Sequence, residues 1–292
     1  MSDSRYGDLG RPPLHEAALR RALVREGGLW RDVRVVEETG STNADLAERA
    51  REGAQEGTVL VTELQTAGRG RLGRTWTAPP RSGLTFSVLL RPRLPVARFA
   101  WASLLTGVAV ATALRRMTAW SQAGEGFLGD GGDGGEAGDT AVDVRLKWPN
   151  DVLVGDRKIA GILAEMVDGG LVVGVGLNVG LSEEELPVPT ATSLAIEGAP
   201  LSDRAPLLRA ILREFGTWYQ EWTALGGDPE SSGLRTAYRD LCATLGREVR
   251  VEMPGGGRLA GTARDVDEAG RLVVAGPDGD TAVSAGDVVH VR

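Results

Sequence analysis

Residues 62–76 read TELQTAGRGRLGRTW, set among ordinary strand-forming sequence. In this stretch, which we call the arginine loop, three glycines are interleaved with three arginines: Gly68, Gly70, Gly73, Arg69, Arg71 and Arg74. Glycine permits positive φ angles and a close approach of backbone N–H groups to a ligand, and the planar guanidinium group suits carboxylate and phosphate. The loop therefore predicts a binding site for an anion.

The same spacing satisfies the dinucleotide-binding pattern G-x-G-x-x-G. That pattern needs a helix that opens at the glycines and an acidic residue about 20 positions later. Here residues 74–80 are loop-like, and residues 83–90 (GLTFSVLL) read as a strand followed by Arg91 and Arg93. A Rossmann site is therefore not expected. Taken alone, an Arg-rich turn is more often a solvated surface turn, so a ligand site requires support from elsewhere in the chain.

The composition narrows the classes of function. The chain has 292 residues, of which 42% are hydrophobic and 25% charged, which is typical of a folded protein with one large and one small domain. A net charge of -7 argues against a general nucleic-acid or membrane-surface binder, so the arginines read as a local site. We expect no signal peptide and no apolar run near the ~18 residues of a membrane span, and hence a cytoplasmic protein.

Few residues are available for nucleophilic or metal chemistry. Cys242 is the only cysteine, and His15 and His290 are the only histidines. A disulfide, a thiolate metal cluster, a histidine zinc site and a His-based triad are therefore not expected. Chemistry must rest on Lys, Arg, Asp, Glu, Asn and bound ligands.

The order of periodic segments predicts a mixed α/β domain over residues 31–245, preceded by a mobile segment and short helix over 1–30. Residues 121–140 hold repeated Gly, Asp and Glu, which predicts a disordered insertion. Residues 246–292 consist of short alternating runs separated by Gly-rich turns, which predicts a small antiparallel barrel. The short N-terminal helix is expected over about 13–26, and the helices expected in the large domain cover about 42–51, 99–117, 206–222 and 232–245.

A second cluster of glycines and charges follows the insertion. A strand over 142–146 ends in KWPND at 147–151, and a hairpin over 152–167 leads to the strand LVVGVGLNV at 171–179. Three glycines, Gly161, Gly174 and Gly176, weaken these strands, which indicates a close approach of a ligand or of neighbouring backbone. Asn178, a polar residue in an apolar strand, should have a hydrogen-bonding role.

Together the two clusters resemble the motifs of biotin–protein ligases from about residue 33 to 292. The matching motifs are GSTN (40–43), QTAGRGRLGRTW (65–76), KWPND (147–151), KIAGIL (158–163) and GVGLNV (174–179). The resemblance implies a catalytic α/β domain with a mixed, mainly antiparallel sheet like that of class II synthetases, followed by an SH3-like barrel. No room is left for an N-terminal winged helix-turn-helix, so the ligase-only group is implied, with no DNA partner and no membrane.

The resemblance also implies chemistry. Biotin and ATP would form biotinyl-5'-AMP, with Mg²⁺ accompanying ATP through protein ligands that the sequence does not identify. Biotin would then pass to a lysine of a biotin carboxyl carrier domain. The implied catalytic residues are Lys158, Arg69 and Arg71. Those implied for biotin binding are Ser41, Thr42, Asn43, Gln65, Gly68, Arg69, Gly70, Arg71, Lys158 and Gly161. Those implied for ATP binding are Arg69, Arg74, Trp76, Asn150, Asp151, Lys158 and Asn178.

Two other functions stay open on the sequence. A lipoate or octanoate ligase shares this architecture, and a biotin-binding or sensing protein with little turnover would carry the same motifs. Trp76 is either an adenine-stacking residue or a core tryptophan, and Ser41 and Thr42 also read as simple helix caps. A homodimer formed through a sheet edge is possible, but nothing in the sequence tests it.

Overall fold

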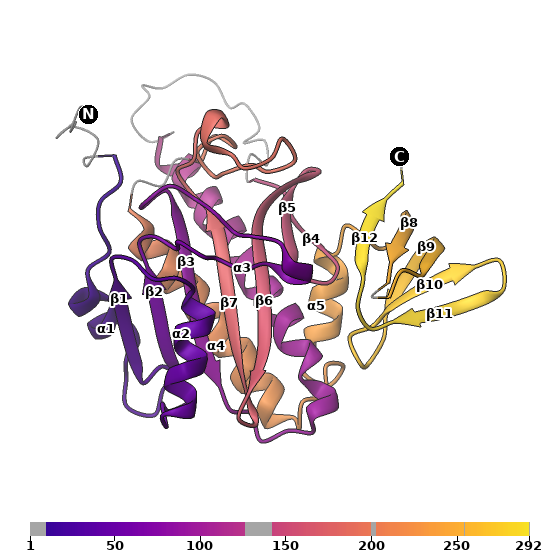
Figure 1. Ribbon diagram of the computed structural model, residues 1–292, viewed down its shortest axis with the longest axis horizontal. Helices are drawn as coiled ribbons and strands as arrows, with labels where there is room; N and C mark the ends of the chain where they lie inside the picture. The colour runs from indigo at the N-terminus through magenta and orange to yellow at the C-terminus, as the bar shows by residue number, and fades with distance from the viewer. Residues whose placement is uncertain (1–9, 126–141, 200–202, 254, 292) are drawn as a thin grey trace.

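The structure is a computed structural model, which describes residues 10–125, 142–199, 203–253 and 255–291. The described residues form a large body around one sheet and a smaller unit around a second sheet (Figure 1). Residues 1–9 of the predicted mobile segment lie outside the described residues, as does most of the insertion predicted over 121–140. The preceding helix continues to Glu125, so the first part of that insertion is helical, contrary to the prediction.

A seven-stranded sheet forms the centre of the large body, in the order β1-β2-β3-β7-β6-β5-β4. Among the described strands, β1 and β2 pair in parallel and the other neighbours in this sheet are antiparallel. The predicted mixed, mainly antiparallel sheet is therefore confirmed. Its strands are β1 (Asp32–Val36), β2 (Thr58–Thr62), β3 (Gly83–Leu90), β4 (Val144–Lys147), β5 (Asp151–Val154), β6 (Arg157–Val167) and β7 (Gly170–Asn178).

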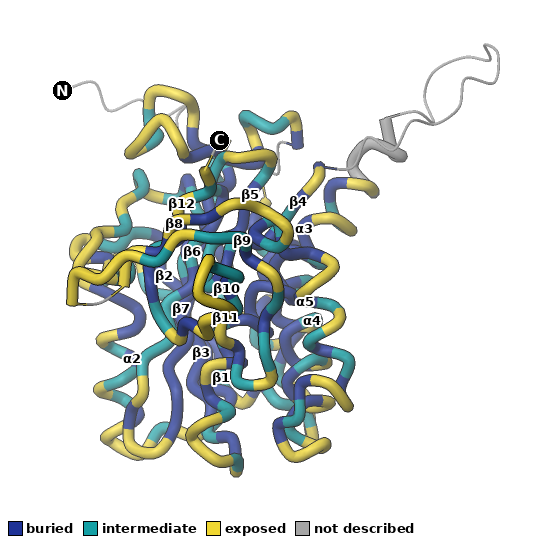
Figure 2. The backbone as a smooth tube through the Cα atoms, turned by 90° about the vertical axis from the view of Figure 1, so that its right-hand side faces the viewer, coloured by how far each residue is buried: buried dark blue, intermediate teal, exposed yellow. Residues whose placement is uncertain are grey.

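Helices cover both faces of this sheet. One face carries α2, which packs over β3 and β7, and the other carries α3, with α4 and α5 packed against it (Figure 1). The main core lies between the sheet and α3 and α4, where buried segments gather (Figure 2), and a smaller core lies under α2. The helices are α1 (Glu16–Leu23), α2 (Thr42–Arg51), α3 (Ala100–Glu125), α4 (Arg204–Ala224) and α5 (Leu234–Leu241).

The apolar helix α3 corrects one expectation. Within Val96–Ala119 a window with a mean hydropathy of 1.4 is long and apolar enough to cross a membrane, so the prediction that no such run exists was wrong. In the fold, 67% of that window is buried, packed on the sheet and on α4. A helix that is apolar on most sides suits such a position at the centre of a large core.

The smaller unit is a five-stranded antiparallel sheet in the order β11-β10-β9-β8-β12. Val249 and Val251 of β8 are buried and alternate with exposed residues, as the sequence pattern predicts for a half-buried strand. The antiparallel C-terminal unit is therefore confirmed, whereas its SH3-like barrel form stays a prediction. Its strands are β8 (Glu248–Glu252), β9 (Arg258–Val266), β10 (Leu272–Gly276), β11 (Gly279–Val283) and β12 (Asp287–His290).

Two tryptophans of the large body fasten the C-terminal unit to it. Trp148, within KWPND, donates from Nε1 to the carbonyl oxygen of Gly270 at 3.0 Å, and Trp101 of α3 donates to that of Glu268 at 2.8 Å. Both rings are buried, so these bonds fix the position of the C-terminal sheet beside KWPND. The predicted boundary at 245/246 lies between α5 and β8 and stays a prediction.

Candidate active site

The parallel pair β1 and β2 brings the two N-terminal motifs together. Beyond the ends of these strands the backbones stay paired, since the Thr39 N–H donates to Leu64 at 3.0 Å and the Ala67 N–H to Gly40 at 2.8 Å. GSTN therefore begins α2 directly beside the start of the arginine loop. As predicted, Ser41 is the N-cap of α2, accepting from the Ala44 N–H at 3.5 Å.

The arginine loop is folded back on itself. The Gly70 N–H donates to Arg74 at 2.7 Å, and the Trp76 N–H donates to Gly68 at 2.9 Å. Of the three glycines, only Gly73 has a positive φ, of 73°. Gly68 is required by space instead, because a Cβ there would lie 2.3 Å from the Trp76 carbonyl oxygen.

The glycines of β6 and β7 form a flat floor under two side chains. A Cβ added at Gly176 would lie 2.3 Å from the indole of Trp76, and one added at Gly174 would lie 2.2 Å from Asn43 Oδ1. The predicted close approach at these glycines is therefore real, and the approaching groups are side chains of the protein. The indole Nε1 of Trp76 is buried and has no hydrogen-bond partner.

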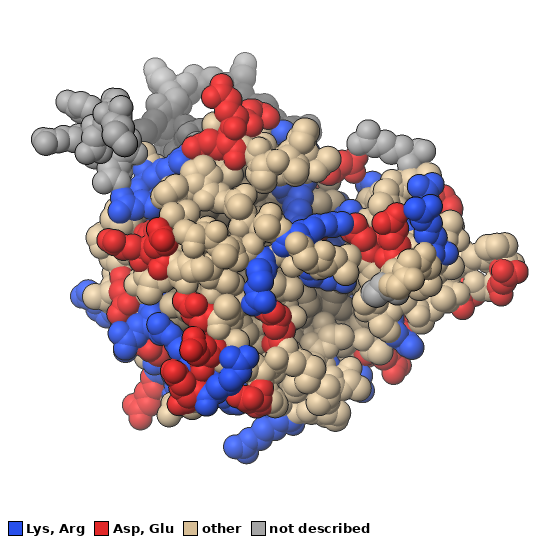
Figure 3. All heavy atoms as spheres, in the orientation of Figure 1, with Lys and Arg blue, Asp and Glu red and all other residues tan. Residues whose placement is uncertain are grey.

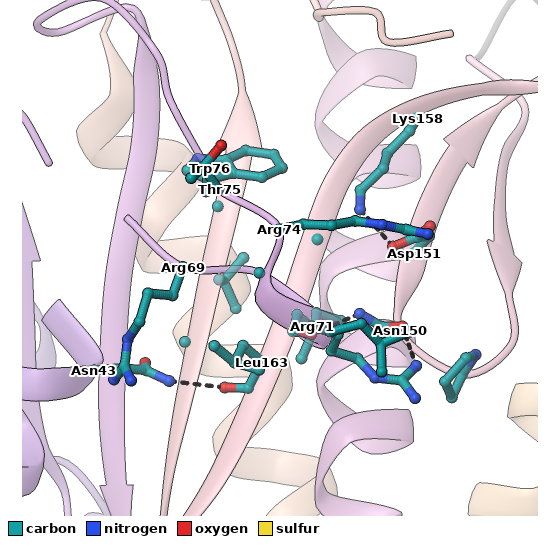
Figure 4. A pocket seen from close by; sticks show the side chains of 18 of the residues that line it. Asn43, Arg69, Arg71, Arg74, Thr75, Trp76, Asn150, Asp151, Lys158 and Leu163 are labelled. Carbon is teal, nitrogen blue, oxygen red and sulfur yellow. Dashed lines mark hydrogen bonds and ion pairs between the residues drawn. The ribbon is translucent and has the colours of Figure 1, made fainter. Parts of the chain in front are cut away.

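Lys158 lies where the pairing of β5 and β6 shifts register, between Val152 and Leu153. Such irregularities re-aim side chains. Its backbone is held on its other side by the strand-like segment 190–192, through bonds of 2.8 Å to Thr190 and from Thr192. The Nζ atom lies 2.6 Å from Asp151 Oδ1 and 5.8 Å from the centre of the Trp76 ring (Figure 4).

These elements surround one cavity between the large sheet, the arginine loop and β12. Basic side chains gather in the middle of the face shown in Figure 3, between the large body and the C-terminal unit. The predicted site residues that line the cavity are Ser41, Thr42, Asn43, Gln65, Arg69, Gly70, Arg71, Arg74, Trp76, Asn150, Asp151, Lys158 and Gly161.

Two predicted site residues do not line this cavity. Gly68 lies against the backbone of Trp76. Asn178 is buried and donates from Nδ2 to the Thr192 carbonyl oxygen at 2.9 Å, which fulfils its expected hydrogen-bonding role. Through Thr192 it supports the segment that holds Lys158. An adenine contact by Asn178 stays a prediction.

The cavity is basic although the chain is acidic. Five cationic side chains and two carboxylates line it: Arg69, Arg71, Arg74, Lys147, Lys158, Asp151 and Asp287. Most of the cations have an internal partner: Arg71 donates to Asn150 Oδ1 at 2.8 Å (Figure 4), and Arg74 pairs with Asp287. Burial lowers the pKa of Arg71, whereas the hydrogen bond to Asp287 raises that of Arg74. A ligand with several negative charges fits this surplus of positive charge.

The end of the cavity at Thr42, Asn43 and Gln65, which we call the amide end, is polar, with Thr42 and Asn43 buried and Gln65 half-buried. The Asn43 Nδ2 group donates to the Leu163 carbonyl oxygen at 3.1 Å and to Glu165 Oε2 at 2.7 Å, so Oδ1 faces Ser87 Oγ at 2.6 Å. Because Oδ1 only accepts, the single Ser87 proton goes to it. The Thr42 hydroxyl lies 2.8 Å from Ser87 Oγ and donates to Gln65 Oε1 at 3.0 Å, because that amide oxygen also only accepts.

Sequence reasoning missed several lining residues. Lys147 was quoted within KWPND without a role, although it and Lys158 are the only lysines in the chain and both line the cavity. That scarcity was a usable signal. Thr85 belongs to none of the motifs. Asp287 lies in the C-terminal unit, so the position of Asp287 depends on how the two units dock.

Comparisons with known proteins assign this chain to a family. The chain belongs to the biotin/lipoate A/B protein ligase family, whose model matches residues 35–182, and the model of the biotin protein ligase C terminal domain matches residues 244–291. Membership of this family was the expectation from the motifs, and it is confirmed.

Individual relatives agree with that assignment. The chain is 43% identical to the biotin–[acetyl-CoA-carboxylase] ligase of Mycobacterium tuberculosis over 97% of each chain. It also resembles the biotin protein ligase of Aquifex aeolicus in complex with biotin and ATP (TM-score 0.67, 27% identity, 90% of this chain and 100% of that one). The Leishmania major biotin protein ligase in complex with biotinyl-5-AMP aligns with a TM-score of 0.56 and 25% identity over 87% of this chain and 99% of that one.

Proposed function

We propose that this chain is an ATP-dependent biotin–protein ligase, which forms biotinyl-5'-AMP and transfers biotin to a lysine of a biotin carboxyl carrier domain. The observation that carries the proposal is one cavity with a buried amide end and a surplus of positive charge beyond it. An elongated ligand with a polar head and an anionic tail fits that arrangement. The resemblance to the ligases above supports the same assignment.

The amide end favours biotin over lipoate. Gln65 Oε1 accepts from the Thr42 N–H at 2.8 Å, which leaves the Gln65 Nε2 group to donate. Asn43 uses both Nδ2 protons internally, which leaves a lone pair on Oδ1 to accept. A cyclic urea carries both N–H groups and a carbonyl oxygen, so it satisfies this mixture. A dithiolane ring carries neither and would leave buried polar groups unpaired, which strongly disfavours it.

In the first step a carboxylate oxygen of biotin attacks the α-phosphorus of ATP, and pyrophosphate leaves. Two anions must approach each other, and negative charge gathers on the phosphoryl oxygens. Lys158 supplies a compact cation at the centre of the cavity, and Arg71 and Arg69 supply planar donors around it. To do so, Lys158 must exchange its partner Asp151 for the ligand.

In the second step a lysine amine of the carrier domain attacks the acyl carbon of the adenylate, and AMP leaves. The protein need not supply a nucleophile, which is consistent with a cavity whose described lining residues include neither histidine nor cysteine. The arginine loop covers the reacting bond, and shielding it from water prevents hydrolysis of the adenylate. The expected acceptor is the carrier domain of an acetyl-CoA carboxylase, and the expected compartment is the cytoplasm.

Mg²⁺ is expected to enter with ATP. Among the described residues no group of three His, Cys, Asp or Glu side chains is placed to hold a metal ion. Mg²⁺ commonly uses substrate phosphates, waters and one or two carboxylates, and Asp151 is the lining carboxylate of the large body. The ion would neutralise charge on the phosphates. Dimer formation and the absence of DNA binding stay predictions.

The test is transfer to a purified carrier domain, with ATP and either biotin or lipoate, followed by intact mass measurement. The proposal expects one biotin per carrier domain, loss of labelling when the acceptor lysine is replaced by arginine, and little labelling with lipoate. Equal or better labelling with lipoate would indicate the lipoate ligase. Tight biotin binding without any labelling or ATP consumption would indicate a sensor.

A further inference from the structure

Asn43 owes its orientation to Leu163, which lines the cavity, and to Ser87 and Glu165, which do not. The residue is only 4% exposed, so each of its polar side-chain atoms needs a partner. The Leu163 carbonyl oxygen and Ser87 Oγ fix which way the amide points, because reversal would set Oδ1 against a carbonyl oxygen. The second Nδ2 proton is taken by Glu165 at 2.7 Å.

Glu165 lies on β6 and does not line the cavity. Its carboxylate also receives Arg69 of the arginine loop, with Nη2 lying 3.3 Å from Oε1 and 3.4 Å from Oε2. Figure 4 shows the Arg69 side chain reaching toward Asn43. One carboxylate therefore contacts both the amide end and the loop that covers the cavity.

The two contacts of Glu165 differ in strength. The side chain of Arg69 is 51% exposed and that of Glu165 is 35% exposed, so their ion pair is screened by water and contributes little. The bond to Asn43 joins a charged acceptor to a buried amide, and such bonds are among the stronger ones in proteins. The effect of Glu165 should therefore pass mainly through Asn43.

We infer that Glu165 is a positioning residue for the head group of the ligand, acting through Asn43. By taking the second Nδ2 proton it holds the amide so that only the lone pair of Oδ1 is free for the ligand. This role rests on the proposed function, because the ligand that it positions is biotin. Neither the glycine–arginine pattern nor KIAGIL drew attention to Glu165, which lies beyond both.

The test compares Glu165→Ala with Glu165→Gln in biotin-dependent pyrophosphate exchange. In Glu165→Ala the KM for biotin should rise about tenfold or more, because a charge-assisted bond to a buried amide is lost. In Glu165→Gln the amide oxygen still accepts from Asn43, so the KM should stay within about threefold of wild type. The KM for ATP and kcat should change by less than about twofold in both variants.

Two further variants make the result interpretable. Glu214→Ala removes another ion-paired glutamate, which lies on α4 and pairs with Arg116 of α3. This variant should leave kcat and both KM values unchanged. Ser87→Ala removes the donor to Asn43 Oδ1 and should also raise the KM for biotin.

Equal effects of Ala and Gln at position 165 would show that Glu165 acts through its charge on Arg69 and would overturn the inference. An unchanged KM in Glu165→Ala, or a parallel rise in the KM for ATP, would overturn it as well. In either case the proposed function survives, because the wild-type protein exchanges pyrophosphate. Wild-type protein that shows no biotin-dependent exchange would overturn both.

Discussion

Arg74 of the arginine loop and Asp287 of β12 form an ion pair across the junction of the two units, with a second contact of 3.5 Å from Nη1 to Oδ1. The hydrogen bond to Asp287 raises the pKa of Arg74. The C-terminal sheet thereby holds the loop that covers the cavity. The loop is exposed on its outer side, and the pair is exposed at its Arg74 end, so its contribution should be modest.

Asp287→Asn should therefore loosen the arginine loop without unfolding the protein. Trypsin cleavage after Arg71 or Arg74 in ligand-free protein should accelerate by up to about fivefold, since exposed ion pairs contribute about 0.2–1 kcal/mol and cleavage follows the population of the open loop. The matched control is Asp280→Asn, which breaks the exposed pair with Arg264 in the same unit. Cleavage at the wild-type rate in Asp287→Asn would show that the pair does not restrain the loop.

Gly176→Ala should expel Trp76 from the floor of the cavity. The added Cβ would lie 2.3 Å from the indole, so the ring must move, and overpacking of this kind costs about 1–3 kcal/mol. We expect kcat/KM for biotin to fall about tenfold or more, with the melting temperature lowered by only a few degrees. In Gly216→Ala the nearest atom beyond the helix backbone lies at 3.7 Å, so this control should behave as wild type. Undiminished kcat/KM in Gly176→Ala would mean that the indole position is irrelevant to the site.

Protonation of His290 in the unfolded chain should lower the free energy of unfolding in mild acid. Burial, together with nearby Lys147 and Arg247, lowers its pKa to about 4, although Asp156 opposes this shift. In the unfolded chain histidine titrates near pH ~6.5, so between that pH and the folded pKa the unfolded state binds more protons. The stabilisation by neutral His290 is complete above the unfolded pKa and is lost progressively as the pH falls toward the folded pKa.

Melting temperatures measured from about pH 7 down to about pH 4 test this linkage. His290→Gln should lose less stability over that range than wild type, because the uncharged amide does not titrate. His15→Gln changes the other histidine, which is exposed, and should follow wild type. Identical pH profiles for His290→Gln and wild type would contradict the assignment, and the modest burial of His290 implies a small difference.

Local pattern was enough to predict most of the fold. The strand Gly83–Leu90 and the end of α2 at Arg51 fall where hydrophobic alternation and helix signals placed them. Helix ends that depend on tertiary contacts were less predictable: α1 is shorter than expected, and α3 runs past Met117 to Glu125.

The residues of the candidate site were predictable where they belong to a sequence motif. Lys158, Asp151 and the arginines lie in stretches whose composition is unusual, and the structure brings them to one cavity. Ser87, Glu165 and Asp287 lie in unremarkable strands, β3, β6 and β12, and their roles follow from the residues that the fold brings beside them. Such roles depend on register and on the docking of the C-terminal unit, which a single sequence does not specify.

Two substitutions at Lys158 distinguish the effect of its charge from the effect of its shape. Lys158→Ala should lower the rate of adenylate formation by on the order of 10²–10³, as for other groups that stabilise developing charge. Lys158→Arg keeps the charge in a chain whose other cations are nearly all arginine, yet the planar group on a longer stem does not reproduce a compact ammonium beside Asp151. We expect Arg to restore less than about a tenth of the lost rate. Near-normal rates in Lys158→Ala would remove it from the mechanism.

The most direct measurement is exchange of labelled pyrophosphate into ATP by the purified protein with Mg²⁺, with and without biotin. Exchange requires reversible attack of a carboxylate on the α-phosphorus, so it reports adenylate formation without any carrier domain. The account predicts exchange that depends on biotin, is absent with lipoate, and is lost in Lys158→Ala. No biotin-dependent exchange by a folded protein that binds biotin would contradict the claim that this cavity makes biotinyl-5'-AMP.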